Sequence, residues 1–338
     1  MDIYDIAKAS GYSTATVSRV INKQNNVSKK AKEKIEKVIK ESGYTPNRIA
    51  RSLAKKSSEL IGIMVPDIRK YFESQSAYEL EKKLESSGFS TLLCVTTDDL
   101  AKKKSYLDLL LENQVEAIIG VGSTYEQEDF YKTLVEVSKD VPMAMLNVSS
   151  NIGSDRIVNV YIDEIDAMDQ AVSLFERKGY KKPLYVSLDR GFVTRSYVAK
   201  KAGFIEALYK YYDKPDFVEY KLTSHEVSEF HGLIDFISQN DFDCIQFELD
   251  SLAVIFYKLY VNSGHKVPGD LGLIGFDNID ATNFTNQTIT SIDQRIDKQV
   301  DLAVSNLFKI MKGEEASNNI EASNNIMVKA KLVEKETV

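Results

Sequence analysis

The first 45 residues hold three short amphipathic segments separated by turn residues, which restricts this stretch to a small unit made of helices. Asp2 predicts the N-cap of a first helix, and Asp5 stands three residues later, at the spacing of a capping box. Gly11 predicts the turn that ends this helix, because glycine takes up positive φ angles without steric strain.

A second predicted helix, residues 14–21, follows Ser13 and divides into two faces. Its inward side chains are Val17, Val20 and Ile21, and its outward ones are Thr14, Ala15, Thr16, Ser18 and Arg19. Ser and Thr are weak helix formers, but they suit a face that meets phosphates and base edges. A third helix, capped by Ser28 and ending near Ser42, carries most of its lysines outward. This order favours a helix-turn-helix unit that lies on DNA.

Charge is divided unevenly along the chain. Residues 1–60 hold 13 Lys/Arg and 6 Asp/Glu, a net charge of +7, whereas the rest holds 30 and 44, a net charge of −14. A basic N-terminal segment on an otherwise acidic protein indicates that the two parts have different functions, with nucleic-acid binding in the basic part. A lysine-rich helix alone is often only a solvated face, so the prediction depends on charge, turn and polar helix together.

The same residues resemble, without gaps, the lactose-repressor (LacI/GalR) family of bacterial transcription factors. The matching strings are Ile3-Tyr4-Asp5-Ile6-Ala7, Gly11-Tyr12-Ser13, Thr16-Val17-Ser18-Arg19-Val20-Ile21-Asn22, Val27-Ser28, Gly43-Tyr44-Thr45-Pro46-Asn47 and Ala50-Arg51-Ser52-Leu53-Ala54. A single helix-turn-helix is a weak motif, but the whole string is specific. The resemblance implies a homodimer that binds double-stranded operator DNA.

The resemblance also implies which residues contact the DNA. Base-reading positions fall at Thr14, Ala15 and Arg19. Positions that hold the DNA backbone fall at Ser13, Thr16, Ser18, Asn22 and Ser28. Because the first two base-reading residues are small, we expect base choice to depend on Arg19, whose guanidinium can donate two hydrogen bonds to a guanine.

Residues 47–55 follow Pro46 and are predicted to form a short hinge helix. In the family such a helix folds when two subunits meet on DNA, and a leucine, here Leu53, wedges into the minor groove. The alternative is that Leu53 is an ordinary apolar linker residue. The other residues that the resemblance assigns to this contact are Asn47, Arg48, Ala50, Arg51 and Ala54.

From residue 60 onward, short apolar runs alternate with helical patterns. Strands are expected at 60–65, 91–95, 117–121, 143–146, 159–162, 184–188, 244–247 and 271–276. Helices are expected at 74–87, 101–113, 126–138, 165–178, 196–212, 226–239, 251–263 and 296–312. The alternation predicts an α/β fold with parallel sheets, and so many strands predict two lobes.

The expected organisation is an all-α helix-turn-helix head (1–45), a hinge helix and linker (46–58) and a core (59–338). The resemblance implies a periplasmic-binding-protein-like core that forms the dimer and holds a sugar-sized effector between its lobes. We expect the first lobe at 59–161 and 293–322, and the second at 162–290 and 323–338. With no apolar run of about 18 residues and no secretory signal before the head, a cytoplasmic protein without a membrane partner is expected. Cys94 and Cys244 are expected to be buried thiols.

We expect six residues to bind the effector: Asp163, Asp277 and Gln294, which the resemblance carries over, together with Arg195, Lys200 and Asp250. Carboxylates suit sugars, because one side chain can accept hydrogen bonds from two neighbouring hydroxyls. In α/β folds the carboxyl ends of strands face the ligand crevice, which favours ligand contact for Asp277. For Asp163, capping of the following helix is an equal alternative.

Two departures from the family pattern bear on the ligand. Lys200 stands where an arginine is common, and Leu249 stands where a polar residue often precedes Asp250. Lysine lacks the planar fork of arginine, so either this contact is lost or Arg195 supplies it. The basic residues Arg190, Arg195 and Lys200 would suit a sugar acid or sugar phosphate, while a neutral sugar remains equally open.

Enzyme chemistry, metals and cofactors are not indicated. There is no G-x-S-x-G motif, the three histidines lack metal-ligand spacing, and Gly120-Val121-Gly122 lacks the remaining residues of a phosphate loop. The sextet Glu-Ala-Ser-Asn-Asn-Ile occurs at 315–320 and again at 321–326, as in a loop duplication. We expect a repressor of a carbohydrate-use operon that its effector releases. The alternatives are a regulator strengthened by a corepressor or phosphocarrier protein, and a sugar-binding protein without a regulatory role.

Overall fold

The computed structural model describes residues 2–21, 26–43, 57–150, 152–314 and 324–338. The chain divides into two compact units, Met1–Glu59 and Leu60–Val338. Each unit has its own hydrophobic core. No helix in these described ranges is long and apolar enough to cross a membrane.

The described part of the N-terminal unit has the three predicted helices, α1 (Ile3–Ser10), α2 (Thr14–Ile21) and α3 (Lys29–Ser42). The Asp2 carboxylate accepts hydrogen bonds from the N–H groups of Tyr4 and Asp5, at 2.8 and 3.0 Å. The Asp5 carboxylate accepts one from the Asp2 N–H at 2.9 Å, which completes the predicted capping box. Gly11 ends α1 with a φ of 71°. The buried core consists of Ile6, Ala7, Val17, Val20 and Ile35.

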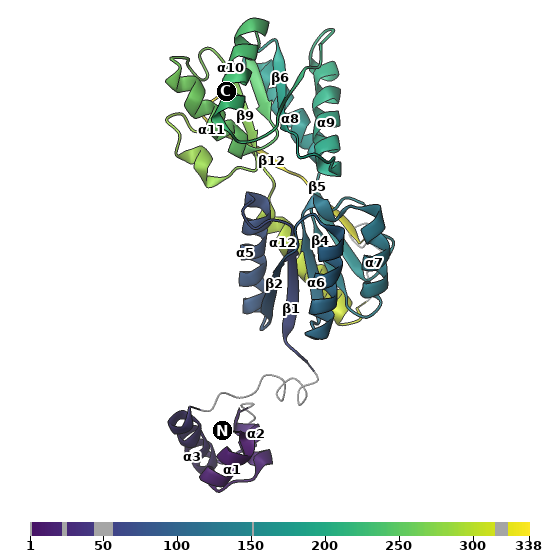
Figure 1. The fold of residues 1–338 in the computed structure, drawn as a ribbon, viewed down its shortest axis with the longest axis vertical. Coiled ribbons are helices and arrows are strands. Elements are labelled where there is room, and N and C mark those ends of the chain that lie inside the picture. The colour runs from purple at the N-terminus through teal and green to yellow at the C-terminus, as the bar shows by residue number, and fades with distance from the viewer. Residues whose placement is uncertain (1, 22–25, 44–56, 151, 315–323) are drawn as a thin grey trace. The chain divides into compact units, whose positions relative to one another are not determined.

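The larger unit has two lobes, each with a six-stranded sheet, as the predicted α/β class requires (Figure 1). In the first lobe the strand order is β11-β5-β4-β3-β1-β2, and all neighbours are parallel. The strands are β1 (Leu60–Val65), β2 (Ser90–Val95), β3 (Ala117–Val121), β4 (Met143–Leu146), β5 (Ile157–Ile162) and β11 (Asn325–Val328). The helices are α5 (Tyr71–Ser86), α6 (Leu100–Glu112), η1 (Ser123–Tyr125), α7 (Glu128–Ser138) and α12 (Ile296–Met311).

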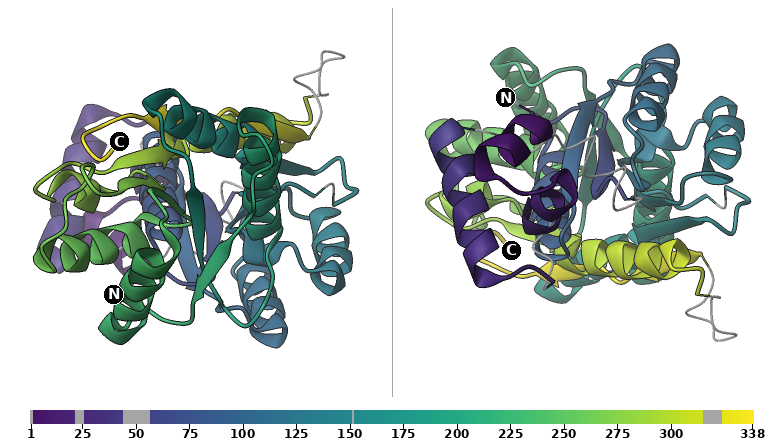
Figure 2. Two further views of the ribbon diagram at one scale, coloured as in Figure 1. Left: turned by 90° about the horizontal axis from the view of Figure 1, so that it is seen from above. Right: turned by 90° about the horizontal axis from the view of Figure 1, so that it is seen from below.

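Alternation along β1 explains how helices cover both faces of the first sheet. Ile61, Ile63 and Val65 join the core under α5 and α12, whereas Met64 joins the core under α6 and α7. The right view of Figure 2 shows α12, in yellow-green, across the sheet from the blue helices. A sheet buried on both faces needs the nearly continuous apolar strands seen in the sequence.

In the second lobe the strand order is β12-β10-β9-β8-β6-β7, parallel except for β12, which is antiparallel to β10. The strands are β6 (Pro183–Leu188), β7 (Glu219–Leu222), β8 (Cys244–Phe247), β9 (Gly272–Phe276), β10 (Thr290–Asp293) and β12 (Lys331–Val333). The helices are α8 (Glu164–Lys178), α9 (Arg195–Tyr211), α10 (Val227–Asn240), α11 (Asp250–Asn262) and η2 (Asp280–Asn283). Helices α8 and α9 pack in one core cluster and α10 and α11 in another.

The chain crosses between the lobes after β5, after β10 and between β11 and β12. The third crossing corrects the expected boundary at residues 322 and 323, because β11 pairs with β5 of the first sheet. The Asn159 side chain fixes this register, since its Nδ2 donates to Oδ1 of Asn325 at 2.7 Å. The crossing therefore lies at residues 329–330, between the two last strands.

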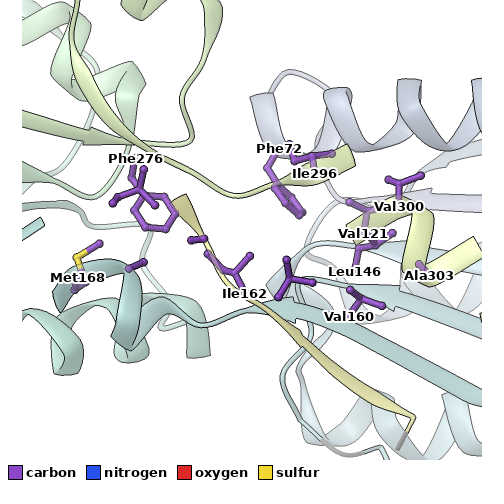
Figure 3. Close-up of a cluster of buried hydrophobic side chains, with 14 of the residues drawn as sticks. Phe72, Val121, Leu146, Val160, Ile162, Met168, Phe276, Ile296, Val300 and Ala303 are labelled. Atoms are coloured by element: carbon purple, nitrogen blue, oxygen red, sulfur yellow. The ribbon is translucent and has the colours of Figure 1, made fainter. Parts of the chain in front are cut away.

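One apolar cluster extends from lobe to lobe through these crossings (Figure 3). Phe72 and Ile296 belong to its first-lobe part, Met168 and Phe276 to its second-lobe part, and Ile162 lies between them. Buried apolar contacts of this kind tie the lobes into one unit. These contacts therefore fix the position of one lobe relative to the other, and with it the space between them.

All eight predicted strands and all eight predicted core helices are present, with bounds within three residues of the prediction. The strands β7, β10, β11 and β12 were not predicted. The equally short β4 and β8 are fully buried apolar runs, whereas β7, β11 and β12 are partly exposed edge strands and β10 (TSID) is mainly polar, so no apolar run marks them. Cys94 and Cys244 are buried free thiols, as predicted.

Candidate functional site

The outward face of α2 presents small polar side chains and one arginine. Its exposed or half-buried residues are Thr14, Ala15, Thr16, Ser18 and Arg19. Ser13 fixes the start of the helix: its hydroxyl accepts from the Thr16 N–H at 3.3 Å and shares a 2.9 Å hydrogen bond with the Thr16 hydroxyl. Both hydroxyls thus lie at the positive end of the helix dipole, which suits a DNA phosphate.

Helix α3 adds positive charge to the same unit. Lys32 and Lys37 form exposed pairs with Glu36 and Glu41, at 3.9 and 3.8 Å, which contribute little to stability. Four further exposed lysines have no acidic partner within 4 Å among the described residues: Lys29, Lys30, Lys34 and Lys40. Ser28, a predicted backbone contact, caps α3 by accepting from the Ala31 N–H at 3.3 Å.

Seven predicted DNA contacts lie outside the described residues and stay predictions. They are Asn22 and the hinge residues Asn47, Arg48, Ala50, Arg51, Leu53 and Ala54.

A cavity of about 720 Å³ lies between the two lobes of the larger unit. Its lining follows the carboxyl ends of β1, β3 and β4 in the first lobe and of β6, β8, β9 and β10 in the second. This is where α/β folds bind ligands, and the volume suits a compound of saccharide size. Three predicted effector residues line it: Lys200, Asp277 and Gln294.

The Arg190 guanidinium in the second-lobe wall is already neutralised. Its Nη1 donates to both carboxylate oxygens of the buried Glu248, at 2.9 and 3.2 Å, and to the Leu188 carbonyl at 3.2 Å. Glu248 also accepts from the Leu188 N–H at 3.1 Å. This pairing leaves little positive charge at Arg190 for an anionic ligand.

Lys200 was predicted to contact the effector, but its side chain is buried in the cavity wall against Phe276. It is 4% exposed, and its Nζ lies 3.6 Å from the centroid of the Phe276 ring, a cation–π contact. The Nζ also donates to the Glu248 carbonyl at 3.4 Å. The Lys200 charge is therefore stabilised inside the cavity wall. It does not offer a ligand the planar two-pronged donor group that an arginine would.

Asp277 reaches the cavity from a strained turn after β9. Its φ is 112° and that of Asn278 is 50°, values that are costly for residues other than glycine and that concentrate at functional sites. Gln294 Nε2 donates to the Asp277 carboxylate at 2.5 Å. Burial raises the pKa of Asp277 to about 6, although the Lys200 charge and the Gln294 hydrogen bond both favour the ionised form.

Glu73, which the sequence reasoning missed, lines the first-lobe wall as the third residue of α5. The residue is 8% exposed, and burial raises its pKa to about 7, although the Lys70 charge lowers it. Its position at the start of the helix that follows the first strand was an available signal, because this end of the sheet faces the crevice in such folds.

The other three predicted effector residues do not belong to the described lining of the cavity. Asp163 caps α8 by accepting from the Asp166 N–H at 3.0 Å, which is the capping alternative. Arg195 begins α9 and is exposed, so it does not replace the common arginine in this cavity.

Asp250 lies beneath the cavity wall rather than in it. It is fully buried, and its two carboxylate oxygens share the single proton of the Ser291 hydroxyl, whose Oγ lies 2.8 and 2.9 Å away; it also accepts a hydrogen bond from the Ile279 N–H at 2.9 Å. Burial raises its pKa to about 7. Because Ile279 lines the cavity, Asp250 supports the turn that carries Asp277.

Comparison with known proteins accounts for both units. Residues 2–47 match bacterial regulatory proteins of the lacI family, and residues 197–338 match a periplasmic binding protein-like domain. An HTH-type transcriptional regulator of Lachnoclostridium phytofermentans is 31% identical over 97% of this chain and 98% of its own length. The ribose operon repressor of Halalkalibacterium halodurans is 28% identical over 87% of this chain and 85% of its own length.

Among solved structures, the lac repressor dimer bound to operator and the anti-inducer ONPF matches with a TM-score of 0.84 and 21% identity. The match covers 100% of this chain and 98% of that chain. It confirms the predicted fold class, a helix-turn-helix head with a two-lobed α/β core.

Proposed function

The chain belongs to the lacI family of bacterial regulatory proteins, and on that basis we propose that it represses a carbohydrate-use operon until a small effector releases it. One observation carries the proposal: a helix with a polar outward face and a cavity of about 720 Å³ between two lobes occur in one chain. We expect the protein to act in the cytoplasm, where its operator lies.

For DNA binding, we propose that a homodimer places one α2 per half-site in the major groove of a pseudo-palindromic operator. Arg19 is the proposed base reader, and Thr14 and Ala15 leave room for a thymine methyl group. The exposed lysines of α3 supply affinity that does not depend on sequence and that falls with salt. The hinge segment 47–55 is the proposed minor-groove element.

For the effector, we propose a hydroxyl-rich compound rather than a sugar acid or sugar phosphate. An anion needs cations that are free to bind it, but of the four in the described lining Arg190 is paired with Glu248, Arg69 is paired with Asp67 and Lys200 rests on Phe276, which leaves Lys70 alone. Ser123, Thr124 and Asn147 line the opposite wall with neutral polar groups that suit hydroxyls. The effector regulates the protein only if it binds one lobe arrangement better than the other.

The experiment compares Arg19→Ala with Lys34→Ala in gel shifts, on an operator selected from random DNA. Arg19→Ala should lose about 1–3 kcal/mol of binding and relax the base preference at one position per half-site. Lys34→Ala should weaken binding about equally on all sequences. An Arg19→Ala protein with unchanged affinity and base preference would contradict the assignment.

Adding the effector to the same gel shifts gives the sign of regulation. Release of the operator supports the inducer-controlled repressor that we propose. Tighter binding would instead support the corepressor alternative.

A further inference from the structure

We propose that the interlobe cavity recognises a polyhydroxylated compound that carries a protonated amine, and that Glu73 and Asp277 bind this amine from opposite lobes. The inference rests on the proposed ligand-controlled regulation and specifies the chemical class of the ligand. An amino sugar is the simplest compound of this class.

Glu73 is a buried carboxyl without a partner from another residue. It is 8% exposed and lines the cavity, and no other described residue donates a hydrogen bond to it or lies within ion-pair distance. Only its own N–H is hydrogen-bonded to it. Gly122 lies close to this carboxyl, since a Cβ there would lie 3.4 Å from Oε1 of Glu73. Glu73 lines the cavity, where a donor on a ligand can reach its carboxylate.

Asp277 contributes a second carboxyl from the other lobe. The two acids influence each other across the cavity, because the charge of Asp277 raises the pKa of Glu73. Gln294 supplies one donor to Asp277, which leaves acceptor capacity on this carboxylate. Two carboxyls therefore line one cavity from facing lobes.

The lysines nearby do not neutralise this pair. Neither Lys70 nor Lys200 lies within 4 Å of either acid in the described structure, and the Lys200 Nζ is engaged with Phe276 and the Glu248 carbonyl. Both lysines favour ionisation, yet burial still raises the pKa values of Glu73 and Asp277 to about 7 and about 6. A ligand that brings positive charge and hydrogen-bond donors to Glu73 and Asp277 would therefore favour the ionised form of both acids.

An ammonium group supplies both, with three donors and a full positive charge. A hydroxyl would supply donors but would leave two like charges facing each other. The remaining charged groups of the lining pair among themselves, Arg69 with Asp67 at 2.8 Å and Arg190 with Glu248 at 2.9 Å. The two carboxyls of Glu73 and Asp277 therefore set the preference for an amine.

The test measures binding of matched sugar pairs to the full chain by calorimetry: D-glucosamine with D-glucose, and D-galactosamine with D-galactose. We expect the amino member of at least one pair to bind about tenfold tighter or better at pH 7.5. Its N-acetyl derivative, which has no charge, should lose this advantage. Lowering the pH to 5.5 should reduce it, because Glu73 and Asp277 then become protonated.

The decisive variant is Glu73→Gln, which keeps the shape and removes the charge. It should bring the ratio of the amine's affinity to that of its neutral parent close to one, and the exposed Glu81→Gln on the same helix should leave this ratio unchanged. The proposal is overturned if no amine binds, if neutral parents bind equally well in both pairs, or if Glu73→Gln keeps the preference. Operator gel shifts on the same samples separate the outcomes, because loss of operator binding would count against the proposed function instead.

Discussion

Replacing Glu73 with glutamine measures what it costs this protein to bury an ionised carboxyl. The pKa of Glu73 is raised by burial from the ordinary 4.5 to about 7. Between these pH values the folded protein keeps a proton that the unfolded chain has lost, so the wild type loses stability as the pH rises through this window. At about 1.4 kcal/mol per pH unit, the loss above pH 8 amounts to roughly 3 kcal/mol.

Glutamine resembles the protonated acid and cannot ionise, so Glu73→Gln should match the wild type at pH 4.5 and be more stable at pH 8.5. For a unit of this size, roughly 3 kcal/mol corresponds to a rise in Tm of about 6 °C or more. Thermal unfolding of the full chain without ligand, followed at both pH values, measures the difference. Glu81→Gln, on the exposed side of α5, is the matched control and should show no such pH dependence. A Glu73→Gln protein that is less stable than the wild type at pH 8.5 would refute the reasoning.

Two further substitutions test other parts of the structure. Gly275→Ala would place a Cβ 1.8 Å from Oδ1 of the buried Asp250, so we expect a loss of about 3 kcal/mol or more in urea denaturation; a loss below about 1 kcal/mol would contradict this contact. Asp2→Ala removes the acceptor for the Tyr4 and Asp5 N–H groups, and should cost the head about 1 kcal/mol. Faster hydrogen exchange confined to α1–α3 is the expected readout, and unchanged exchange there would argue against the cap.

Local pattern predicted the fold well where elements are long. Runs such as 117–121 and 184–188, each followed by a helical pattern, sufficed to predict parallel sheets, because burial on both faces requires continuous apolar strands. The short edge strands depend on pairing instead: β11 has its place because Asn159 and Asn325 bond across the register. Such a contact joins residues far apart in the sequence and leaves no local pattern.

The site was predictable in part, and two physical reasons account for what was missed. Lys200, Asp277 and Gln294, three of the expected effector residues, line the cavity. Asp250 shows that a carboxylate which supports a turn looks, in sequence, like one that meets a ligand. Glu73 was missed because the expected helix began at 74, whereas α5 begins at Tyr71. Its N-cap, Lys70, offers no side-chain cap, so the usual helix-start signal is absent.

The strands β11 and β12 have a consequence for synthesis of the protein. Only one short crossing separates them, yet they form the edges of two different sheets. The ribosome synthesises residues 325–333 after all the other strands. Neither sheet is therefore complete until this last segment has been made. Until then the edges of β5 and β10 stay open, and open edges are where nascent chains pair with one another. A chain that stops before residue 325 would leave both lobes unfinished at once, so even a short truncation should produce aggregation rather than a regulator with one working lobe.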